Sequence, residues 1–338
     1  VAVVMAHLLR VFLTGGWHGA RRFNWIVGLA LLALVLAANF SGYLLPWDQL
    51  AYWAVTICTG MLGYIPFIGE WLQRVVRGGA DLGPATLVLF YAFHTTLIPV
   101  VLLLLMGFHF WRVRKAGGVV DPRPPDEIGE EEKPWVSTLP DLLLRELAAG
   151  LALVAVVLVL ALLFDAPLGA PANPGMSPNP AKAPWYFVGF QELQLHFHPL
   201  FAVVVIPGLA VMALLLIPYL KYDSEPTGPW FLSPVGRRTA AVAAVAALVI
   251  TPILIVVDEL WLHPSAGLPS LIGRGLAPLT LLAAAVLGFR FVLVRKFGAS
   301  KAEVVQALFI LFLVALAVLT VTGAWFRGPG MALSWPWG

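Results

Sequence analysis

The sequence predicts an all-α integral membrane protein, and two features of its composition carry that prediction. Of the 338 residues, 60% are hydrophobic and only 12% are charged. A soluble domain has about 25% charged residues, so this chain has too few charges to cover a surface that faces water. Its apolar residues are gathered in long runs, and in lipid such runs must be helical because every backbone polar group needs an internal partner.

Seven apolar runs of about 20 residues predict seven whole transmembrane helices. The runs cover 25–45, 85–111, 142–164, 200–220, 239–258, 276–294 and 303–325. An eighth run, 1–13, is too short to cross the membrane, and it lacks the charged start and cleavage site of a signal peptide. We interpret it as the last half of a helix that begins outside this sequence. The expected fold is therefore about seven full helices and one partial helix.

The positions of the basic residues predict which loops face the cytoplasm. Sixteen of the 21 lysines and arginines lie in or beside the loops around 14–24, 112–141, 221–238 and 295–302. Cytoplasmic loops carry an excess of these residues. We therefore expect these four loops on the inner side of the membrane, and the long loops 46–84 and 165–199 on the outer side.

An acidic, proline-rich segment divides the chain into two helical halves. The segment 113–140 predicts a cytoplasmic linker between an N-terminal half, 1–112, and a C-terminal half, 141–338, that ends in an additional helix. The net charge of +3 comes with no basic cluster, which excludes a nucleic-acid-binding protein. The single cysteine, Cys58, excludes a disulfide framework or an iron–sulfur cluster within the chain.

Three histidines lie inside the apolar runs, where an ionisable group indicates a functional site. They are His7, His94 and His109. His94 and His109 are 15 residues apart, which on a helix places them within roughly 60° of one face and roughly 22 Å apart in height. That separation is too large for a shared metal ion. It predicts one ligand for each of two large cofactors stacked across the membrane, and haem fits because imidazole is a good axial ligand.

Each such cofactor needs a second ligand, and helices nearby must leave it room. His7 lies at the depth of His109 and is its expected partner, whereas the partner of His94 is expected in the part of the first helix that precedes this sequence. Gly28 and Gly42 are 14 residues apart, again on one face at two depths. Glycine lets a flat ring approach a helix closely. Ordinary packing of small residues between helices is the alternative explanation.

Several motifs, in order along the chain, resemble cytochrome b, the haem-bearing subunit of the quinol-oxidising Rieske/cytochrome bc complexes. They are His7-Leu-Leu-Arg10, the segment 41–47 (SGYLLPW), Arg145-Glu146 and Pro184-Trp185-Tyr186. The 15-residue interval between His94 and His109 is similar to that of the plastoquinol-oxidising chloroplast branch, whereas the mitochondrial branch has 14.

The resemblance implies a four-helix haem-binding bundle, whose first helix and part of whose second lie outside this sequence, followed by the C-terminal half. It implies two haem b groups. The inner haem would be held by His7 and His109, with Arg10 at a propionate. The outer haem would be held by His94 and a histidine outside this sequence, with Gly28 and Gly42 giving the two rings clearance.

The resemblance also implies two quinone sites and a set of partners. The outer quinol site would include Tyr43, Pro46, Trp47, Pro184, Trp185 and Tyr186. Arg145 and Glu146 would lie at the inner quinone site. One electron from the quinol would go to a Rieske iron–sulfur protein and the other through the two haems to the inner quinone, with proton translocation. The chain would act only within a complex, expected to be a homodimer that includes a cytochrome c-type subunit.

Pro184 occupies a position where the family usually has a glutamate, and this departure favours menaquinol as the substrate. Another group must then accept the proton, and we expect it to be Glu192, about two turns beyond Tyr186, with a pKa raised by partial desolvation. The alternative is a surface carboxylate on an amphipathic helix. Asp48, His196 and His198 are lesser candidates.

Two other functions remain open at this point. A two-haem membrane anchor of a formate dehydrogenase or hydrogenase would keep the haem histidines, but it would not need the 41–47 segment or the Pro-Trp-Tyr motif. A proton-coupled transporter would use intramembrane histidines as a relay, but it predicts broken helices with charges near the middle of the bilayer. The spans here are largely uncharged.

Overall fold

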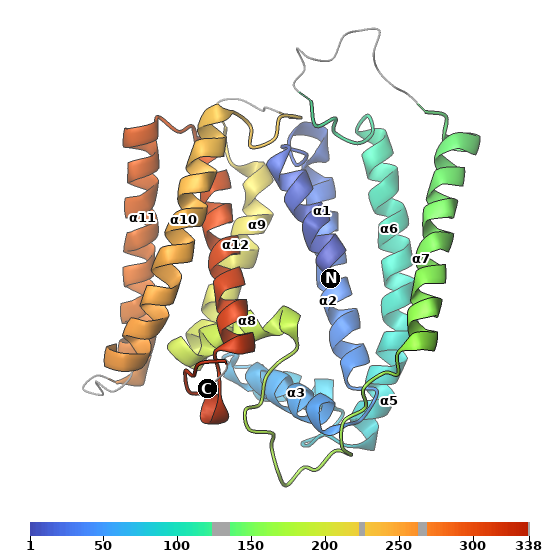
Figure 1. Cartoon of the computed structure of the whole chain (residues 1–338), viewed down its shortest axis with the longest axis vertical. Coiled ribbons are helices and arrows are strands. Elements are labelled where there is room, and N and C mark those ends of the chain that lie inside the picture. Colours follow the sequence, from blue (N-terminus) through green and yellow to red (C-terminus); the bar gives the residue numbers. More distant parts are fainter. Residues whose placement is uncertain (124–135, 223–226, 263–268, 337–338) are drawn as a thin grey trace.

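The computed structural model describes residues 1–123, 136–222, 227–262 and 269–336. Residues 124–135 of the predicted linker therefore lie outside the described residues. Within these ranges the regular structure is helical, apart from two isolated β-bridges. Figure 1 shows long, roughly parallel helices with short helices grouped near one end. The prediction of an all-α fold is confirmed.

The helices follow the chain in two groups. The first group is α1 (Ala2–Leu13), α2 (Arg22–Tyr43), α3 (Gln49–Gly60), α4 (Gly69–Arg77), α5 (Pro84–Ala92) and α6 (Ile98–Lys115). The second is α7 (Leu143–Leu163), α8 (Trp185–His196), α9 (Ile206–Leu216), α10 (Pro234–Val257), α11 (Ala277–Phe297) and α12 (Lys301–Trp325). A π-helical turn, Phe93–Leu97, joins α5 and α6 into one continuous rod.

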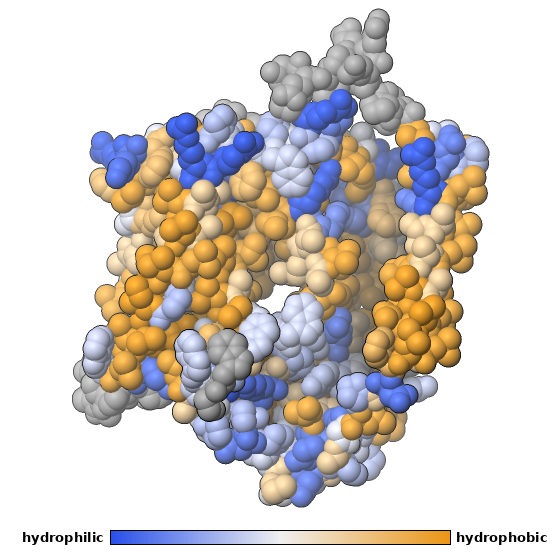
Figure 2. All heavy atoms as spheres, viewed as in Figure 1, coloured by the Kyte–Doolittle hydropathy of each residue, from blue (hydrophilic) through white to orange (hydrophobic). Residues whose placement is uncertain are grey.

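Seven helical segments of the described chain are long and apolar enough to cross a membrane, as predicted. They are Gly19–Tyr43, Pro84–Lys115, Thr138–Leu163, Phe201–Tyr219, Pro234–Trp261, Ile272–Phe297 and Lys301–Trp325. The short apolar helix Ala2–Leu13 is also present. Figure 2 shows an apolar band across the middle of the molecule, with hydrophilic side chains toward its two ends.

Polar side chains define where several helices begin. Asp48 caps α3, since its carboxylate accepts a hydrogen bond from the amide of Ala51 at 2.8 Å. Ser300 and Glu303 form a reciprocal capping box at the start of α12. Such caps satisfy amides that have no partner within the helix.

The loops that carry most of the basic residues lie at one end of the molecule. In Figure 1 the segments that join α1 to α2, α9 to α10 and α11 to α12, and the segment after α6, lie at the top. The helices α3 and α8 and the loop that follows α7 lie at the bottom. The predicted grouping of the loops is therefore confirmed, and we call the basic end inner and the opposite end outer.

Packing differs greatly among the spans. Helix α12 packs extensively against α10 and α8, and α2 packs against α6. Near the inner end, Phe12, Trp17 and Trp25 form a buried aromatic cluster with Ile217. By contrast, no residue in the apolar stretch of the α7 span is buried against the rest of the described chain.

Candidate functional site

The two histidines of the α5–α6 rod each face one of the two glycines of α2. A Cβ atom added to Gly42 would lie 2.6 Å from Cε1 of His94, and one added to Gly28 would lie 3.5 Å from Cε1 of His109. Both imidazoles are half-buried. The structure thus brings together the two histidines and two glycines that sequence spacing had paired, at two levels along the same pair of helices.

The ring of His94 is oriented by α2. Its Nδ1 lies 3.0 Å from the carbonyl oxygen of Ala38 and 3.2 Å from the hydroxyl oxygen of Ser41. A proton on Nδ1 satisfies the carbonyl, and Nε2 is then left with its lone pair. Metal-binding histidines are usually held in this way, because a bond to one ring nitrogen sets the other as the ligand.

The level of His109 is arranged differently. Its ring lies against the backbone of Asn24 on α2, yet its Nδ1 is buried and has no hydrogen-bond partner among the described residues. His7, on α1, is exposed and close enough to His109 for their charges to interact. The ring of His109 therefore lacks the hydrogen bond through Nδ1 that orients the ring of His94.

These observations fit haem rather than a small metal centre. The described residues contain no group of three or more histidine, cysteine, aspartate or glutamate side chains able to hold an ion. A haem iron needs only one imidazole on each side. His7 and His109 would supply both imidazoles at one level, and His94 would supply one of the two at the other level. The glycines leave the helix surface flat beside them.

Arginines surround the inner end of α1. Arg10 donates a hydrogen bond to the carbonyl oxygen of Val120, and Arg21 donates to that of Gly118 at 3.1 Å. Both arginines are half-buried. Arg10 thus lies near the His7 level, and a role at a haem propionate stays a prediction.

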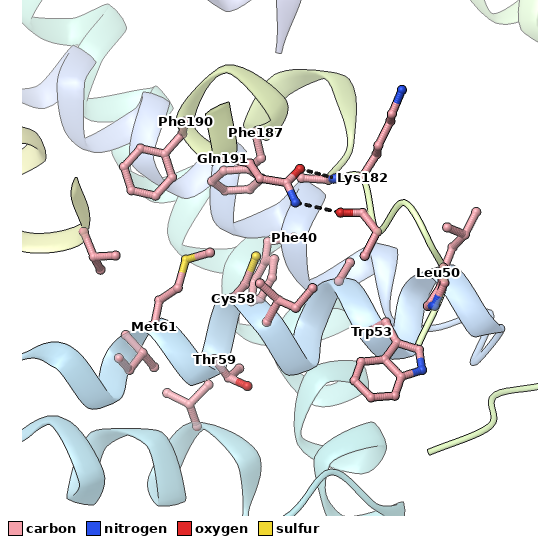
Figure 3. A pocket seen from close by; sticks show the side chains of 18 residues that line it. Phe40, Leu50, Trp53, Cys58, Thr59, Met61, Lys182, Phe187, Phe190 and Gln191 are labelled. Atoms are coloured by element: carbon pink, nitrogen blue, oxygen red, sulfur yellow. Dashed lines mark hydrogen bonds between the residues drawn. The ribbon is translucent and has the colours of Figure 1, made fainter. Parts of the chain in front are cut away.

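A cavity of about 290 Å³ lies at the outer end, between α3, α8 and the loop before α8. Figure 3 shows its walls, with the Cys58 side chain directed toward Phe40 and Gln191. The Gln191 amide lies in the wall, where its oxygen accepts from the Ala183 amide at 2.8 Å and its nitrogen donates to the Ala181 carbonyl at 2.7 Å. Most of the other lining side chains are apolar, so the cavity suits a hydrophobic ring.

The residues predicted for the outer quinol site lie beside this cavity rather than in its wall. The lining does not include Tyr43, Pro46, Trp47, Pro184, Trp185 or Tyr186. Trp185 is 60% exposed. Tyr186 is half-buried, and its pKa is raised by burial and by the nearby Tyr43 and Cys58. The Pro-Trp-Tyr motif therefore marks the start of the wall-forming helix.

Sequence reasoning missed Trp53, Cys58 and Gln191 as lining residues. Burial raises the pKa of the Cys58 thiol to about 11, so it is protonated at neutral pH. Gln191 follows the Pro-Trp-Tyr motif by little more than one helical turn, and that spacing was the available signal. Trp53 and Cys58 lie on α3, whose lining face could not be identified without the position of α8.

The expected raised pKa of Glu192 is wrong. The residue lies on α8 and its side chain is 0% exposed, so the alternative of a surface carboxylate is wrong as well. Burial alone would raise its pKa, yet hydrogen bonds and charges from His196 and Arg327 outweigh burial and leave the pKa lowered. An ionised carboxylate held by a guanidinium is a poor proton acceptor, so we do not assign Glu192 that role.

Glu192 belongs to a buried ionic cluster that joins three parts of the chain. Arg327, which lies after α12, approaches its carboxylate at 2.6 Å and contacts Glu259 at 3.1 Å. His196 bridges Glu192 at 3.2 Å and Asp258 at 2.7 Å. Burial lowers the pKa of His196, but the two carboxylates outweigh it and raise the pKa overall. We call these five residues the outer ionic cluster.

The other predicted polar residues lie apart from the cavity. Besides capping α3, Asp48 accepts from the amide of Gly169 at 3.0 Å, and His198 accepts from the amide of Leu200 at 3.2 Å. Arg145 and Glu146 are exposed on the first turn of α7. The first two therefore stabilise loops, and the inner-site assignment of Arg145 and Glu146 stays a prediction.

Comparison with known proteins gives the family. The profile described as cytochrome b(N-terminal)/b6/petB matches residues 1–173, about half of the chain. This chain belongs to that family. Membership implies a haem b-binding membrane protein of electron transport, and it favours cytochrome b over the membrane-anchor and transporter interpretations.

The relatives in sequence are cytochromes b6. That of Prochlorococcus marinus (strain NATL1A) is 41% identical over 117 residues, which cover 35% of this chain and 54% of the relative. That of Synechococcus sp. (strain CC9605) is 39% identical over the same length and the same shares. This chain thus spans about half the length of the relatives it matches.

A solved structure shares the fold. A chain of the "Hyperthermophilic respiratory Complex III" superposes with a TM-score of 0.59 and 23% sequence identity, over 93% of this chain and 76% of that chain. At this level of identity the likeness shows the fold alone, and it extends through the C-terminal half.

Proposed function

We propose that this chain is the haem- and quinone-binding core subunit of a quinol-oxidising bc-type complex. One observation carries the proposal: two histidine levels lie on one rod, and an apolar cavity lies at the outer end of the molecule, where Phe40 of α2 is part of its wall. A quinol bound there would lie on the side of the His94 level, while the His109 level lies toward the opposite membrane face. This is the arrangement that charge movement across a membrane requires.

The histidines would divide between two haem b groups. His7 and His109 would hold the inner haem, and His94 would hold the outer one with a histidine outside this sequence. Bound haem b supplies one-electron transfer. The chain itself orients the ligands, since Ala38 and Ser41 fix the ring of His94. Gly28 and Gly42 keep the surface of α2 clear beside both imidazoles.

The cavity between α3 and α8 would take the quinol head group. Phe40, Trp53 and Phe187 offer apolar surface to a ring, and Gln191 offers an amide near it. Tyr43 and Tyr186 would flank the entrance with Pro46, Trp47, Pro184 and Trp185. Pro184, in place of an acidic residue, favours menaquinol over ubiquinol as the substrate.

The partners are inferred from the electron balance of quinol oxidation. A quinol releases two electrons and two protons. One electron would pass to a Rieske iron–sulfur protein and then to a cytochrome c-type subunit. The other would cross to a quinone bound near Arg145 and Glu146 at the inner end, where protons are taken up. The complex would be a homodimer in a bacterial cytoplasmic membrane, and this chain would not act alone.

The test is to fill the cavity in the complete complex and measure quinol:cytochrome c reductase activity. Ala54 lines the cavity on α3, so Ala54→Phe should displace the substrate. We expect kcat/KM to fall at least about tenfold with an unchanged b-type haem spectrum, because the loss is confined to substrate binding. Ala149→Phe, on the exposed surface of α7, is the matched control. Equal activity of the two variants would exclude this cavity as the quinol site.

The choice of quinol has its own measurement. The same complex is assayed with menaquinol and ubiquinol analogues that carry the same tail. We expect a higher kcat/KM for the menaquinol analogue. A preference for the ubiquinol analogue would overturn the inference from Pro184 while leaving the cavity assignment intact.

A further inference from the structure

Helix α8 presents different residues to the cavity and to α12. Phe187, Phe190 and Gln191 line the cavity. Val188, Gly189 and Glu192 are buried on another face. That face packs against α12, so the position of α12 determines where the cavity wall stands.

The two helix backbones touch through a pair of glycines. A Cβ atom on Gly189 would lie 3.0 Å from the carbonyl oxygen of Leu316 and would meet the hydroxyl of Thr320. One on Gly323 would lie 2.9 Å from Cγ2 of Val188. Because neither glycine has a side chain, the two helices pack closely here, and a shift of α12 is passed directly to α8.

Arg327 fastens this contact. Its Nε lies 3.1 Å and 3.0 Å from the two carboxylate oxygens of Glu192, and its Nη2 lies 2.6 Å from Oε1. Arg327 is 2% exposed and Glu192 is fully buried. A guanidinium that bonds both carboxylate oxygens fixes the distance and the orientation of the two side chains. A lysine ammonium in its place would not fix the orientation.

The end of α12 also holds the loop that forms the other wall. Lys182, which lines the cavity, donates to the carbonyl oxygen of Ala324 at 2.9 Å. The amide of Gly330 donates to the side-chain oxygen of Asn179, next to the lining residue Pro178. The segment 323–331 therefore contacts both α8 and the loop, and we call it the C-terminal clamp.

The charges around Glu192 come from every neighbouring element. On α8 itself there is His196, and the end of the α10 span supplies Asp258 and Glu259. The clamp supplies Arg327. Arg274, at the start of the α11 span, donates to the carbonyl oxygen of Leu195 near the end of α8. The clamp thus provides the guanidinium that directly binds the Glu192 carboxylate.

We propose that the C-terminal clamp positions both walls of the quinol cavity, with Arg327 as the positioning residue that acts through Glu192. The proposal rests on the proposed function for its kinetic part. It assigns a role to the helix 301–325 and its tail, which lie outside the part of the chain that the family profile covers.

The first measurement does not depend on activity. Arg327→Gln is placed in the full-length chain of the intact complex, and backbone hydrogen exchange is followed in 178–196. We expect faster exchange there than in the wild type, because removing the guanidinium leaves the buried Glu192 carboxylate with only His196 as its partner. The b-type haem spectrum should be unchanged. The control is Arg295→Gln, an exposed arginine at the inner end of α11. Unchanged exchange in Arg327→Gln would overturn the clamp.

The second measurement separates positioning from general stability. In Arg327→Gln the apparent KM for menaquinol should rise about tenfold while kcat changes less, since ground-state binding is what a displaced wall loses. Arg327→Lys keeps the charge but loses the guanidinium, and should lie between wild type and Arg327→Gln. An equal fall in kcat and kcat/KM with no change in KM would contradict a positioning role.

The pH dependence gives a signature specific to the ion pair. In Arg327→Gln the Glu192 carboxylate keeps only His196 as its partner, so burial should raise its pKa above that in the wild type. The carboxylate is then charged at high pH and protonated as the pH falls. The KM defect should therefore shrink at low pH. The double variant Glu192→Gln/Arg327→Gln has no carboxylate at position 192. Its KM should therefore be lower than that of Arg327→Gln at high pH, and it should lack the improvement at low pH that protonation of this carboxylate gives. Identical pH profiles of the two variants would overturn the role of Glu192.

The outcomes also separate the clamp from the proposed function. If the wild-type complex does not oxidise quinols, the proposed function fails, and the exchange experiment still decides whether the clamp holds α8. If Arg327→Gln does not assemble, the double variant takes its place in the exchange experiment, because it removes both buried charges together. Wild-type exchange in 178–196 of an assembled double variant would then overturn the clamp.

Discussion

The two histidine levels of the α5–α6 rod share one plan but differ in how each imidazole is held. Both rings face a glycine on α2. The ring of His94 is tied to Ala38 and Ser41 through Nδ1, whereas Nδ1 of His109 has no hydrogen-bond partner among the described residues. The outer imidazole is therefore oriented by protein alone, and the inner one lacks that tie.

The difference teaches that helical spacing sets where a ligand lies but not how firmly it is held. A ring that is already oriented loses less freedom when a cofactor binds. A ring with an unpartnered buried nitrogen gains an interaction that folding alone did not supply. We therefore expect the two levels to respond differently to the same substitution.

The largest effects should come from removing the ligands themselves. His94→Ala and His109→Ala should each abolish one of the two proposed haem sites and so remove about half of the b-type absorbance, since each iron needs its axial imidazole. The measurement is the reduced-minus-oxidised spectrum of the purified complex. His198→Gln, in a histidine that only accepts from a loop amide, is the control. Full absorbance in either alanine variant would exclude that histidine as a haem ligand.

The glycines should give an intermediate and unequal effect. Gly42→Ala places a methyl group within 2.6 Å of the His94 ring, and Gly28→Ala places one at 3.5 Å from that of His109. The first distance requires the ring to move and the second is ordinary contact. We expect a clear loss of haem b in Gly42→Ala and near wild-type content in Gly28→Ala.

Haem extraction and pigment analysis measure that difference. Gly107→Ala, on α6 with open space at its Cβ, serves as a control for the change of residue type. A greater loss in Gly28→Ala than in Gly42→Ala would contradict the prediction that the helix contact is tighter at the His94 level than at the His109 level.

Ser41→Ala should have the smallest effect. His94 would lose its hydroxyl contact but keep the carbonyl of Ala38, so the cost should be about 0.5–1.5 kcal/mol, typical of one hydrogen bond. The expected result is a modest shift in the midpoint potential of the outer haem, with unchanged haem content. Potentiometric titration checks it, and a shift confined to the inner haem would be inconsistent with this contact.

Some of these features could be predicted from the sequence because they repeat with the period of a helix. His94, His109, Gly28 and Gly42 lie on two neighbouring spans, and their spacing alone predicted two levels. The seven spans were predictable for a related reason, since lipid requires long apolar helices. Their boundaries differ by a few residues where polar caps and interfacial turns extend the helices.

The outer end was harder to predict because its partners are distant in sequence. Glu192 and Arg327 are 135 residues apart, and nothing in either local segment indicates the other. Glu192 was expected to have a raised pKa from its burial alone, and the hydrogen bonds and charges of His196 and Arg327 reversed the sign. The cavity likewise depends on the position of α3 relative to α8, and the periodicity of the sequence does not predict that position.

The π-helical turn at Phe93–Leu97 has a consequence for the length of the rod. A π turn accommodates about one more residue than an α turn, so it can absorb a single-residue insertion without rotating the helix beyond it. Fifteen residues with one such turn advance much as fourteen do in a regular helix, which leaves roughly 40° rather than 60° between the two imidazole directions. A homologue with one residue fewer in this stretch could keep both imidazoles facing α2 without a π-helical turn.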